Sequence, residues 1–249
     1  MARSNGDTIL AATGLTKRYG GLIANNAVSM KLRKGEIRGL IGPNGAGKTT
    51  FVNLITGIET PDAGSVLLSG IEIVDLEPNR IAHAGLVRSF QVARIFPNLS
   101  VTENMLVPFL AAGAPGGARS GLDKAAELLK LATLDPLARA PAGSLSGGQR
   151  MLLQACTGFM IPGVRLFVLD EPFAGINPVV KDTLIDLIIS QNKTNGITFL
   201  IVSHEMEIVK RLCPRVTVMI AGAVAAEGTL EEIARREDVI EAYLGRGAA

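Results

Sequence analysis

The glycine-rich loop from Gly42 to Thr49 constrains the fold of this chain more than any other stretch of its sequence. It fits the pattern G-x-x-x-x-G-K-[ST], and it lies after an apolar run, 36–41, and before a segment with helical apolar spacing. The glycines let backbone N–H groups converge on phosphate oxygens, which the N-terminus of the following helix also favours. The sequence therefore predicts a strand, a phosphate-binding loop and a helix in succession.

The side chains of this loop have distinct predicted roles. Lys48 supplies a mobile point charge to the outer phosphates, and Thr49 offers its hydroxyl to Mg²⁺. The residues of the loop that we expect to bind ATP are Gly42, Asn44, Gly45, Ala46, Gly47, Lys48, Thr49 and Thr50.

Two adjacent carboxylates, Asp170 and Glu171, follow an apolar run that is predicted as a strand. Carboxylates at the end of such a strand face the ligand edge of an open sheet. Asp170 is expected to hold Mg²⁺ through its water shell, because this ion keeps several waters and takes one or two carboxylates. Glu171 is expected to orient and deprotonate the attacking water. Together with the loop, the pair predicts nucleotide hydrolysis.

Apolar periodicity indicates an α/β fold with a mainly parallel sheet. Strands are expected at 9–13, 28–33, 36–41, 65–68, 85–90, 164–169 and 198–202. Helices are expected after the loop, where Phe51, Leu54, Ile55 and Ile58 share one buried face despite Gly57, and at 122–132 and 180–188. We expect the glycine-rich segment 113–121 to be a flexible surface loop.

Composition limits the class of protein. The formal net charge of the 249 residues is +2, and Lys and Arg form no stripe, which disfavours a nucleic-acid partner. Apolar runs stay below the roughly 20 residues of a bilayer helix, so a role at a membrane would require docking. The polar N-terminus and the isolated Cys156 and Cys213 predict a reducing, cytoplasmic compartment with two buried free thiols.

A second glycine-rich segment, Leu145-Ser146-Gly147-Gly148-Gln149, indicates the family. It opens a helix whose predicted apolar face is Leu152, Ala155 and Phe159, and so creates a second anion site. In this order with the loop and the acidic strand, the segment resembles the signature of ABC ATPases over nearly the whole chain. The resemblance implies head-to-tail dimers, in which Ser146, Gly147, Gly148 and Gln149 contact ATP bound to the loop of the other subunit.

The resemblance also implies the architecture of an ABC ATPase. We expect a P-loop NTPase core with a mainly parallel sheet, an N-terminal antiparallel β-subdomain and an inserted α-helical signature subdomain. The expected boundaries within one domain, 1–249, are 1–91 and 161–228 for the core, 92–160 for the helical subdomain and 229–249 for a C-terminal helical tail.

Three further positions match the family's pattern. Tyr19 resembles the aromatic residue that stacks on adenine, and Gln91 resembles the residue that touches Mg²⁺ or the lytic water and signals to the membrane subunits. His204 resembles the switch histidine that contacts the γ-phosphate, whereas His83 lies in a helix-like stretch and has no predicted role. The implied catalytic residues are Glu171, His204, Lys48 and Gln91, and the implied metal ligands are Thr49, Gln91 and Asp170.

Details of the sequence resemble the ATPase subunits of branched-chain amino-acid importers, or of related amide or urea importers. They are Phe90-Gln91, the segment 96–104, the ending 239–245 and Asn177, which stands where many ABC ATPases carry aspartate. Two residues depart from the common pattern, Cys156 for arginine and Pro214 for aspartate. The ATPase of the lipopolysaccharide export machinery is the nearest alternative, because the segment 171–175 and the ending 243–245 are also similar there.

Non-transport members of the family form the other alternative. Chromosome-maintenance ATPases would need a long coiled coil between Lys48 and Asp170, and translation-associated proteins would need a second phosphate loop. The importer resemblance implies ATP and Mg²⁺ as cofactors and a second ATPase subunit, identical or paralogous. It also implies transmembrane permease subunits, an extracytoplasmic binding protein acting through them, and a place on the cytoplasmic face of the inner membrane.

Overall fold

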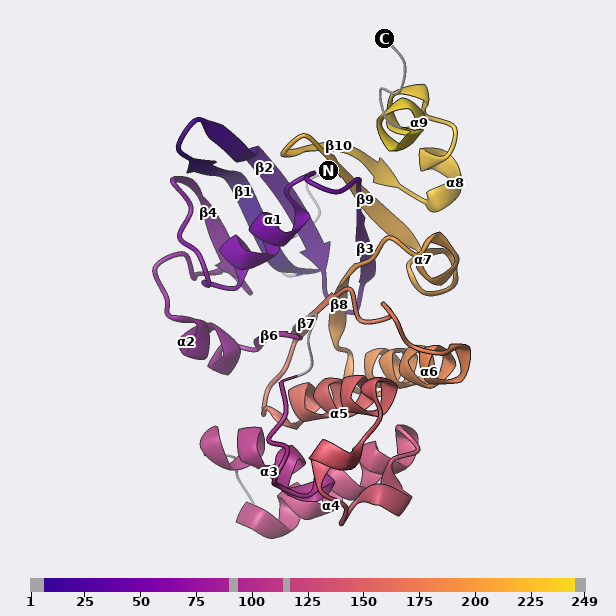
Figure 1. Ribbon diagram of the computed structural model, residues 1–249. Helices are drawn as coiled ribbons and strands as arrows, with labels where there is room; N and C mark the ends of the chain where they lie inside the picture. The colour runs from indigo at the N-terminus through magenta and orange to yellow at the C-terminus, as the bar shows by residue number, and fades with distance from the viewer. Residues whose placement is uncertain (1–6, 90–93, 114–116, 245–249) are drawn as a thin grey trace.

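The computed structural model describes residues 7–89, 94–113 and 117–244 and contains two sheets (Figure 1). The larger sheet has the strand order β10-β9-β3-β8-β7-β6. Its strands are β3 (Ile37–Ile41), β6 (Leu86–Arg88), β7 (Leu166–Asp170), β8 (Thr198–Val202), β9 (Arg215–Ile220) and β10 (Ala223–Gly228). Only the β9–β10 pair is antiparallel among the described pairs of this sheet, so β3, β7 and β8 end at one edge.

The smaller sheet is antiparallel and is built mostly from the N-terminal part of the chain. Its order is β2-β1-β4-β5, with β1 (Thr8–Tyr19), β2 (Leu22–Arg33), β4 (Ala63–Leu68) and β5 (Ile71–Glu72). The two sheets confirm the predicted α/β class with a mainly parallel core sheet and an antiparallel N-terminal sheet.

Helices lie in several regions around these sheets (Figure 1). The helix α1 (Lys48–Ile55) lies beside the antiparallel sheet, and α3 (Val101–Ala111), α4 (Gly117–Leu131) and α5 (Gly147–Met160) form a separate helical layer at the opposite end. The remaining helices are α2 (Pro78–His83), α6 (Pro178–Asn195), α7 (Met206–Leu212), α8 (Leu230–Ile233) and α9 (Glu237–Leu244). Within the described ranges, we find no helix with the length and apolarity required to cross a bilayer.

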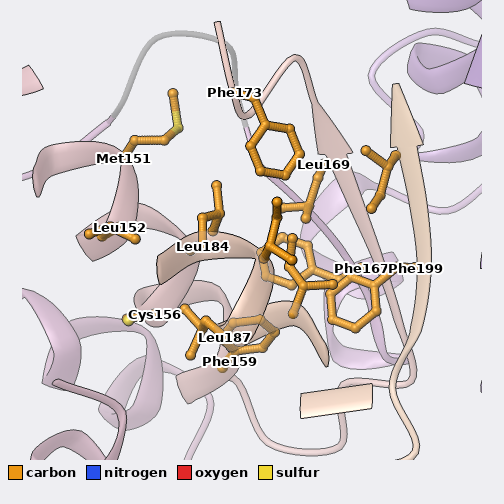
Figure 2. Packing of buried hydrophobic residues seen from close by; sticks show 14 of the residues in the cluster. Met151, Leu152, Cys156, Phe159, Phe167, Leu169, Phe173, Leu184, Leu187 and Phe199 are labelled. Atoms are coloured by element: carbon orange, nitrogen blue, oxygen red, sulfur yellow. The ribbon is translucent and has the colours of Figure 1, made fainter. Parts of the chain in front are cut away.

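An aromatic cluster ties α5 to the parallel sheet (Figure 2). The ring of Phe159 on α5 lies edge-on to Phe167 on β7 and Phe199 on β8, with centroids 5.1 and 6.1 Å away. A Cβ atom on Gly158 would lie 2.3 Å from Cζ of Phe167, so only glycine allows this approach. The predicted apolar face of α5 is confirmed, since Leu152, Ala155 and Phe159 are buried.

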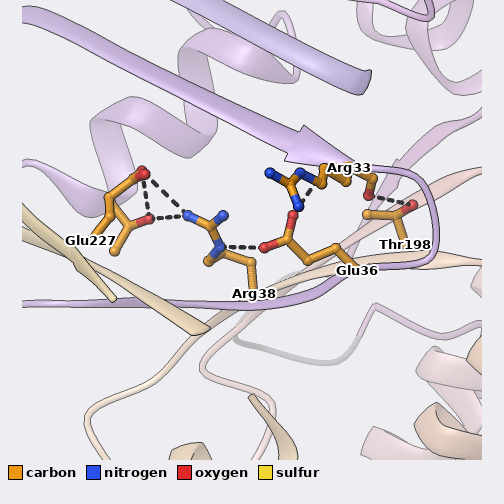
Figure 3. A network of polar contacts seen from close by, with 6 residues as sticks. Arg33, Glu36, Arg38, Thr198 and Glu227 are labelled. Carbon is orange, nitrogen blue, oxygen red and sulfur yellow. Dashed lines mark hydrogen bonds and ion pairs between the residues drawn. The ribbon is translucent and has the colours of Figure 1, made fainter. Parts of the chain in front are cut away.

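A buried polar network holds the amino end of β3 (Figure 3). Arg38 Nε donates to Glu36 Oε1 at 2.6 Å, and Arg38 Nη1 donates to Thr217 Oγ1 at 2.9 Å and lies 3.3 Å from Glu227 Oε1. A buried guanidinium requires such partners, because an unpaired buried charge is strongly destabilising. The phosphate-binding loop follows the other end of β3, so this network supports the sheet rather than the loop.

Two sequence expectations about glycine-rich segments are wrong. The helix α1 ends at Ile55, and Ile58 is 44% exposed rather than buried, because Gly57 adopts a left-handed conformation with φ of 70°. Residues 117–121 are not a loop but the first part of α4. Gly121 is buried there, and a Cβ atom on it would lie 2.8 Å from Cδ1 of Phe109, so this glycine permits close packing of α3 and α4.

Candidate nucleotide-binding and hydrolysis site

The backbone of the loop between β3 and α1 is fixed by close contacts that only glycine permits. Gly42 has φ of 150°, and a Cβ atom there would lie 2.2 Å from the carbonyl oxygen of Met219. Gly47 has φ of 92°, and its Cβ atom would lie 2.4 Å from the carbonyl oxygen of Ala24. Gly47 is also the N-cap of α1 and makes no side-chain capping bond, so the first N–H groups of α1 are open to an anion.

The side chain of Lys48 folds back onto this loop. Its Nζ donates to the carbonyl oxygens of Gly42 at 2.6 Å and Pro43 at 3.0 Å. Burial lowers the pKa of Lys48 below its ordinary value, while the carboxylates of Glu171 and Asp170 act in the opposite direction. The ammonium group therefore lies on the loop, within electrostatic reach of the acidic end of β7.

The other loop residues differ in exposure. Ala46 is buried and its carbonyl oxygen accepts from the N–H of Gly222 at 3.1 Å, which anchors the middle of the loop. Asn44 and Gly45 are exposed at its tip, and Thr49 is exposed in the first turn of α1. Exposed N–H and hydroxyl groups at these positions suit a solvent-borne phosphate ligand.

The acidic end of β7 is held by a buried ion pair. Arg88, the last residue of β6, donates from Nη2 to Oδ2 of Asp170 at 2.7 Å, and both side chains are 9% exposed. Arg88 was not predicted as a site residue, although the sequence contains one signal: a charged residue at the end of an otherwise apolar strand, β6, which pairs with the acidic strand β7.

Glu171 and His204 come together from the ends of β7 and β8. His204 Nδ1 lies 2.9 Å from Oε2 of Glu171, and the N–H of Glu171 donates to the carbonyl oxygen of Val202 at 2.9 Å. Glu171 has φ of 49°, a conformation that non-glycine residues rarely adopt and that often marks a functional site. Lys48, Asp170, Glu171 and His204 thus converge at one edge of the sheet.

The donors at this edge fit Mg²⁺. Thr49 and Asp170 offer a hydroxyl and a carboxylate oxygen, which are the hard oxygen ligands that this ion takes alongside waters and phosphates. The described residues form no cluster of three or more His, Cys, Asp or Glu side chains suited to a metal ion. Gln91, the third predicted ligand, lies outside the described residues.

Tyr19 lies at the end of β1 with 45% of its surface exposed. Its hydroxyl donates to the Glu59 carboxylate, and this bond is the main cause of a raised Tyr19 pKa. The Nζ atom of Lys17 lies 5.8 Å from the ring centroid. The ring therefore has a defined orientation and an accessible surface, as a base-stacking residue requires.

The signature segment forms a separate helix end. Ser146 is the N-cap of α5: its Oγ accepts from the N–H of Gln149 at 3.3 Å, and Gln149 Oε1 accepts from the N–H of Ser146 at 2.9 Å. Among the described residues, no hydrogen bond or ion pair joins 146–149 to the loop at 42–50. Gly147 faces open space, so this helix end is accessible.

Three other positions noted in the sequence have local roles. Asn177 is the N-cap of α6, and its Oδ1 accepts from the N–H of Val180 at 3.0 Å. Cys156 and Cys213 are buried free thiols, as predicted, and burial raises the pKa of each to about 12. Pro214 follows α7, outside the site.

Comparisons with known proteins agree on the family. A family model described as "ABC transporter" matches residues 25–174, and one described as "Branched-chain amino acid ATP-binding cassette transporter" matches residues 223–249. The chain is 39% identical to the high-affinity branched-chain amino acid transport ATP-binding protein BraF of Pseudomonas aeruginosa, and 38% identical to its counterpart LivG of Escherichia coli. Each alignment covers 95% of this chain and 98% of the relative.

A solved structure agrees with these sequence matches. The chain is similar to the crystal structure of an ATP-binding cassette of an ABC transporter in its ADP conformation. The TM-score is 0.84 at 32% identity, and the match covers 96% of this chain and 99% of the solved one.

Proposed function

The chain belongs to the ABC transporter family as an ATP-binding ATPase, and on that premise we propose that it powers the import of branched-chain amino acids. One observation carries the ATPase part of the proposal: Lys48, Asp170, Glu171 and His204 converge beside an uncapped helix N-terminus. The names of the relatives BraF and LivG support the transported class, and favour it over lipopolysaccharide export.

We propose that the site works mostly by positioning and by neutralising charge. Open N–H groups at the start of α1 and the Lys48 ammonium would bind the phosphates, and Thr49 and Asp170, with Gln91, would hold Mg²⁺. That ion would neutralise the charge that develops on the transferred phosphoryl group. Glu171 would accept the proton of the attacking water, and His204, bonded to Glu171 at 2.9 Å, would contact the γ-phosphate.

We further propose that the complete site needs two subunits. The accessible end of α5, residues 146–149, has no bond to the chain's own loop among the described residues, which supports its binding the ATP of a partner. Closure of a head-to-tail dimer, identical or paralogous, would then place each ATP between one loop and the partner's Ser146.

The site of coupling to permease subunits is proposed to lie between the larger sheet and the helical layer of α3, α4 and α5. A cavity of about 230 Å³ opens there, lined by residues that include Arg94, Phe96, Asn104 and Gln154. Phe96 is 54% exposed at its rim, and Gln91 is close to it in sequence. A permease segment from the cytoplasmic face of the inner membrane would fit this place, with a binding protein acting on the far side.

Phosphate release tests the hydrolysis part of this proposal. Glu171→Gln should bind Mg-ATP with near wild-type affinity and release phosphate at least about 100-fold more slowly, because the amide is not a base. Near-normal release by this variant would remove Glu171 from its role. Gln91→Ala is the coupling variant: when reconstituted with the permease it should lower transport by more than it lowers hydrolysis, and equal losses of the two would place the coupling elsewhere.

A further inference from the structure

An unbroken series of polar contacts links Tyr19 to Asp170, which we call the Tyr19–Asp170 chain. The Tyr19 hydroxyl donates to Glu59, Asn53 donates from Nδ2 to Glu59 Oε1 at 2.6 Å, and Arg88 donates from Nη1 to Asn53 Oδ1 at 2.6 Å. Arg88 then donates from Nη2 to Asp170 Oδ2 at 2.7 Å. Five residues from β1, α1, the segment after α1, β6 and β7 are thereby connected.

Asn53 is the central member of this chain. Its amide nitrogen holds the tyrosine side and its amide oxygen holds the arginine side. The backbone supports the same arrangement, because the N–H of Glu59 also donates to the carbonyl oxygen of Asn53 at 3.3 Å. Asn53 lies on α1, the helix that begins with Lys48. The tyrosine side and the arginine side are therefore both held to the helix that follows the phosphate loop.

At one end, the Tyr19–Asp170 chain orients the Tyr19 ring, which is proposed to stack on the base of ATP. Tyr19 is about half exposed, and such a side chain would otherwise sample several rotamers. The bond to Glu59 fixes the hydroxyl, and Lys17 Nζ, 5.8 Å from the ring centroid, adds a contact with the ring. Ordering the ring before the nucleotide arrives lowers the entropy cost of binding.

At the other end, the Tyr19–Asp170 chain orients the Asp170 carboxylate, which is proposed to hold Mg²⁺. Arg88 and Asp170 are both nearly buried, where a charge-assisted hydrogen bond is strong and directional. The planar guanidinium bridges Asn53 and Asp170 with two different nitrogens. A lysine at this position would keep the charge but could not form this forked bridge.

We propose that Asn53 and Arg88 are positioning residues that hold the base-stacking ring and the metal carboxylate as one preassembled frame on α1. This inference rests on the proposed function, because it takes Tyr19 as the base contact and Asp170 as the metal contact. In this inference neither residue contacts the nucleotide; each acts through Tyr19 or Asp170. Removal of the Asn53 side chain should therefore loosen both ends of the site.

Calorimetric titration of the full-length chain separates the two ends. The first quantity is the base preference, the affinity for Mg-ATP divided by the affinity for Mg-tripolyphosphate, which has no base. The second is the metal contribution, the affinity for ATP with Mg²⁺ divided by the affinity with EDTA. Both are binding measurements, so they do not depend on turnover.

Each variant has a distinct expected result. Tyr19→Phe keeps the ring and should lower only the base preference, and Arg88→Lys should lower only the metal contribution. Asn53→Ala, which keeps the backbone carbonyl, should lower both. Each loss should be about twofold to tenfold, the range of one hydrogen bond.

The outcomes distinguish this inference from the proposed function. A wild-type chain that binds no Mg-ATP contradicts the proposed function itself. If the wild type binds Mg-ATP but Asn53→Ala leaves either ratio unchanged, the frame is wrong and the function stands. If Asn53→Ala fails to fold, the double variant Glu59→Ala, Arg88→Lys takes its place. It must lower both the base preference and the metal contribution, and a wild-type value of either one overturns the inference.

Discussion

The helices α1 and α5 both begin at glycine-rich segments, but their first N–H groups are in different states. At α1, the N-cap Gly47 has no side chain to bond to them. At α5, Ser146 and Gln149 satisfy two N–H groups reciprocally. A phosphate at α1 therefore meets no competing side-chain cap, whereas a phosphate that binds the N–H of Gln149 at α5 must share or replace the bond made by the Ser146 hydroxyl.

From this difference we expect one chain to carry two anion sites of unequal strength. The loop before α1 also has Lys48 and is rigid, because Gly42 and Gly47 fit against backbone atoms of Met219 and Ala24. The end of α5 has neither feature among the described residues. We expect the loop to bind ATP in a single subunit, and α5 to contribute only when dimer closure brings a phosphate to it.

Gly47→Ala should have the largest effect on this contrast. Its Cβ atom would lie 2.4 Å from the Ala24 carbonyl oxygen, so the loop must shift, and Mg-ATP affinity should fall by roughly 100-fold or about 3 kcal/mol. Gly45→Ala is the matched control: its φ is also positive, at 79°, but nothing lies within 4 Å of the added atom. It should cost about 1 kcal/mol, or roughly fivefold. Equal losses in both variants would contradict the steric account.

Ser146→Ala should have an intermediate effect, confined to α5. Loss of the N-cap should lower the free energy of unfolding by about 1 kcal/mol, measured by urea denaturation. Steady-state hydrolysis should fall roughly tenfold because a phosphate donor is lost, while ATP affinity of the single subunit stays unchanged. Ser144→Ala is the control, since Ser144 Oγ bonds only to the Pro141 carbonyl among the described residues. If Ser146→Ala bound ATP more weakly as a monomer, Ser146 would contact ATP bound to the loop of its own chain, and the two-subunit site would be contradicted.

Labelling of the two cysteines should give the smallest effect. It can sharpen the comparison of α1 with α5, because each thiol lies in one of the two regions. Cys156 lies within α5, and Cys213 packs near Gly39 on β3, the strand before the loop. Burial raises both pKa values from 9.0 to about 12, so iodoacetamide at pH 8 should label neither thiol in the native protein and both in urea. Ser146→Ala should speed labelling of Cys156 alone; fast labelling of wild-type Cys156 would show that α5 opens readily.

The raised pKa values of the two thiols also make the stability of the folded state depend on pH. Between about pH 9 and pH 12 the thiols ionise in the unfolded chain but stay protonated in the folded one. The folded state therefore binds more protons in this window, and its stability should decrease as the pH rises above 9.

Local patterns in the sequence predicted the parts of the fold that depend on neighbouring residues. The strand, loop and helix around Gly42 and the buried face of α5 follow from spacing alone, and the structure confirms them. The end of α1 did not follow, because the helical apolar spacing continues to Ile58, beyond Gly57, whereas the helix ends at Ile55. The helical state of 117–121 did not follow either, because its glycines indicate a loop by composition. Only tertiary contact with Phe109 shows that Gly121 belongs inside a helix.

The site was predictable to the extent that its residues lie in motifs. Lys48, Asp170, Glu171 and His204 were expected, and the structure places them together. Asn53 and Arg88 were not expected, because their contacts join segments far apart in the chain and follow no periodic pattern. Such bridges become visible only when the strands β6 and β7 are placed beside α1.

The central claim, that the loop at Gly42 is half of a site completed by another subunit's Ser146, is tested most directly by the mass of Glu171→Gln in solution. Light scattering during size-exclusion chromatography should show a monomer without nucleotide and a dimer with Mg-ATP. Adding Ser146→Ala to the same chain should return it to a monomer that still binds ATP. If Glu171→Gln saturated with Mg-ATP stays monomeric, or if its dimer persists without the Ser146 hydroxyl, the two-subunit site is contradicted.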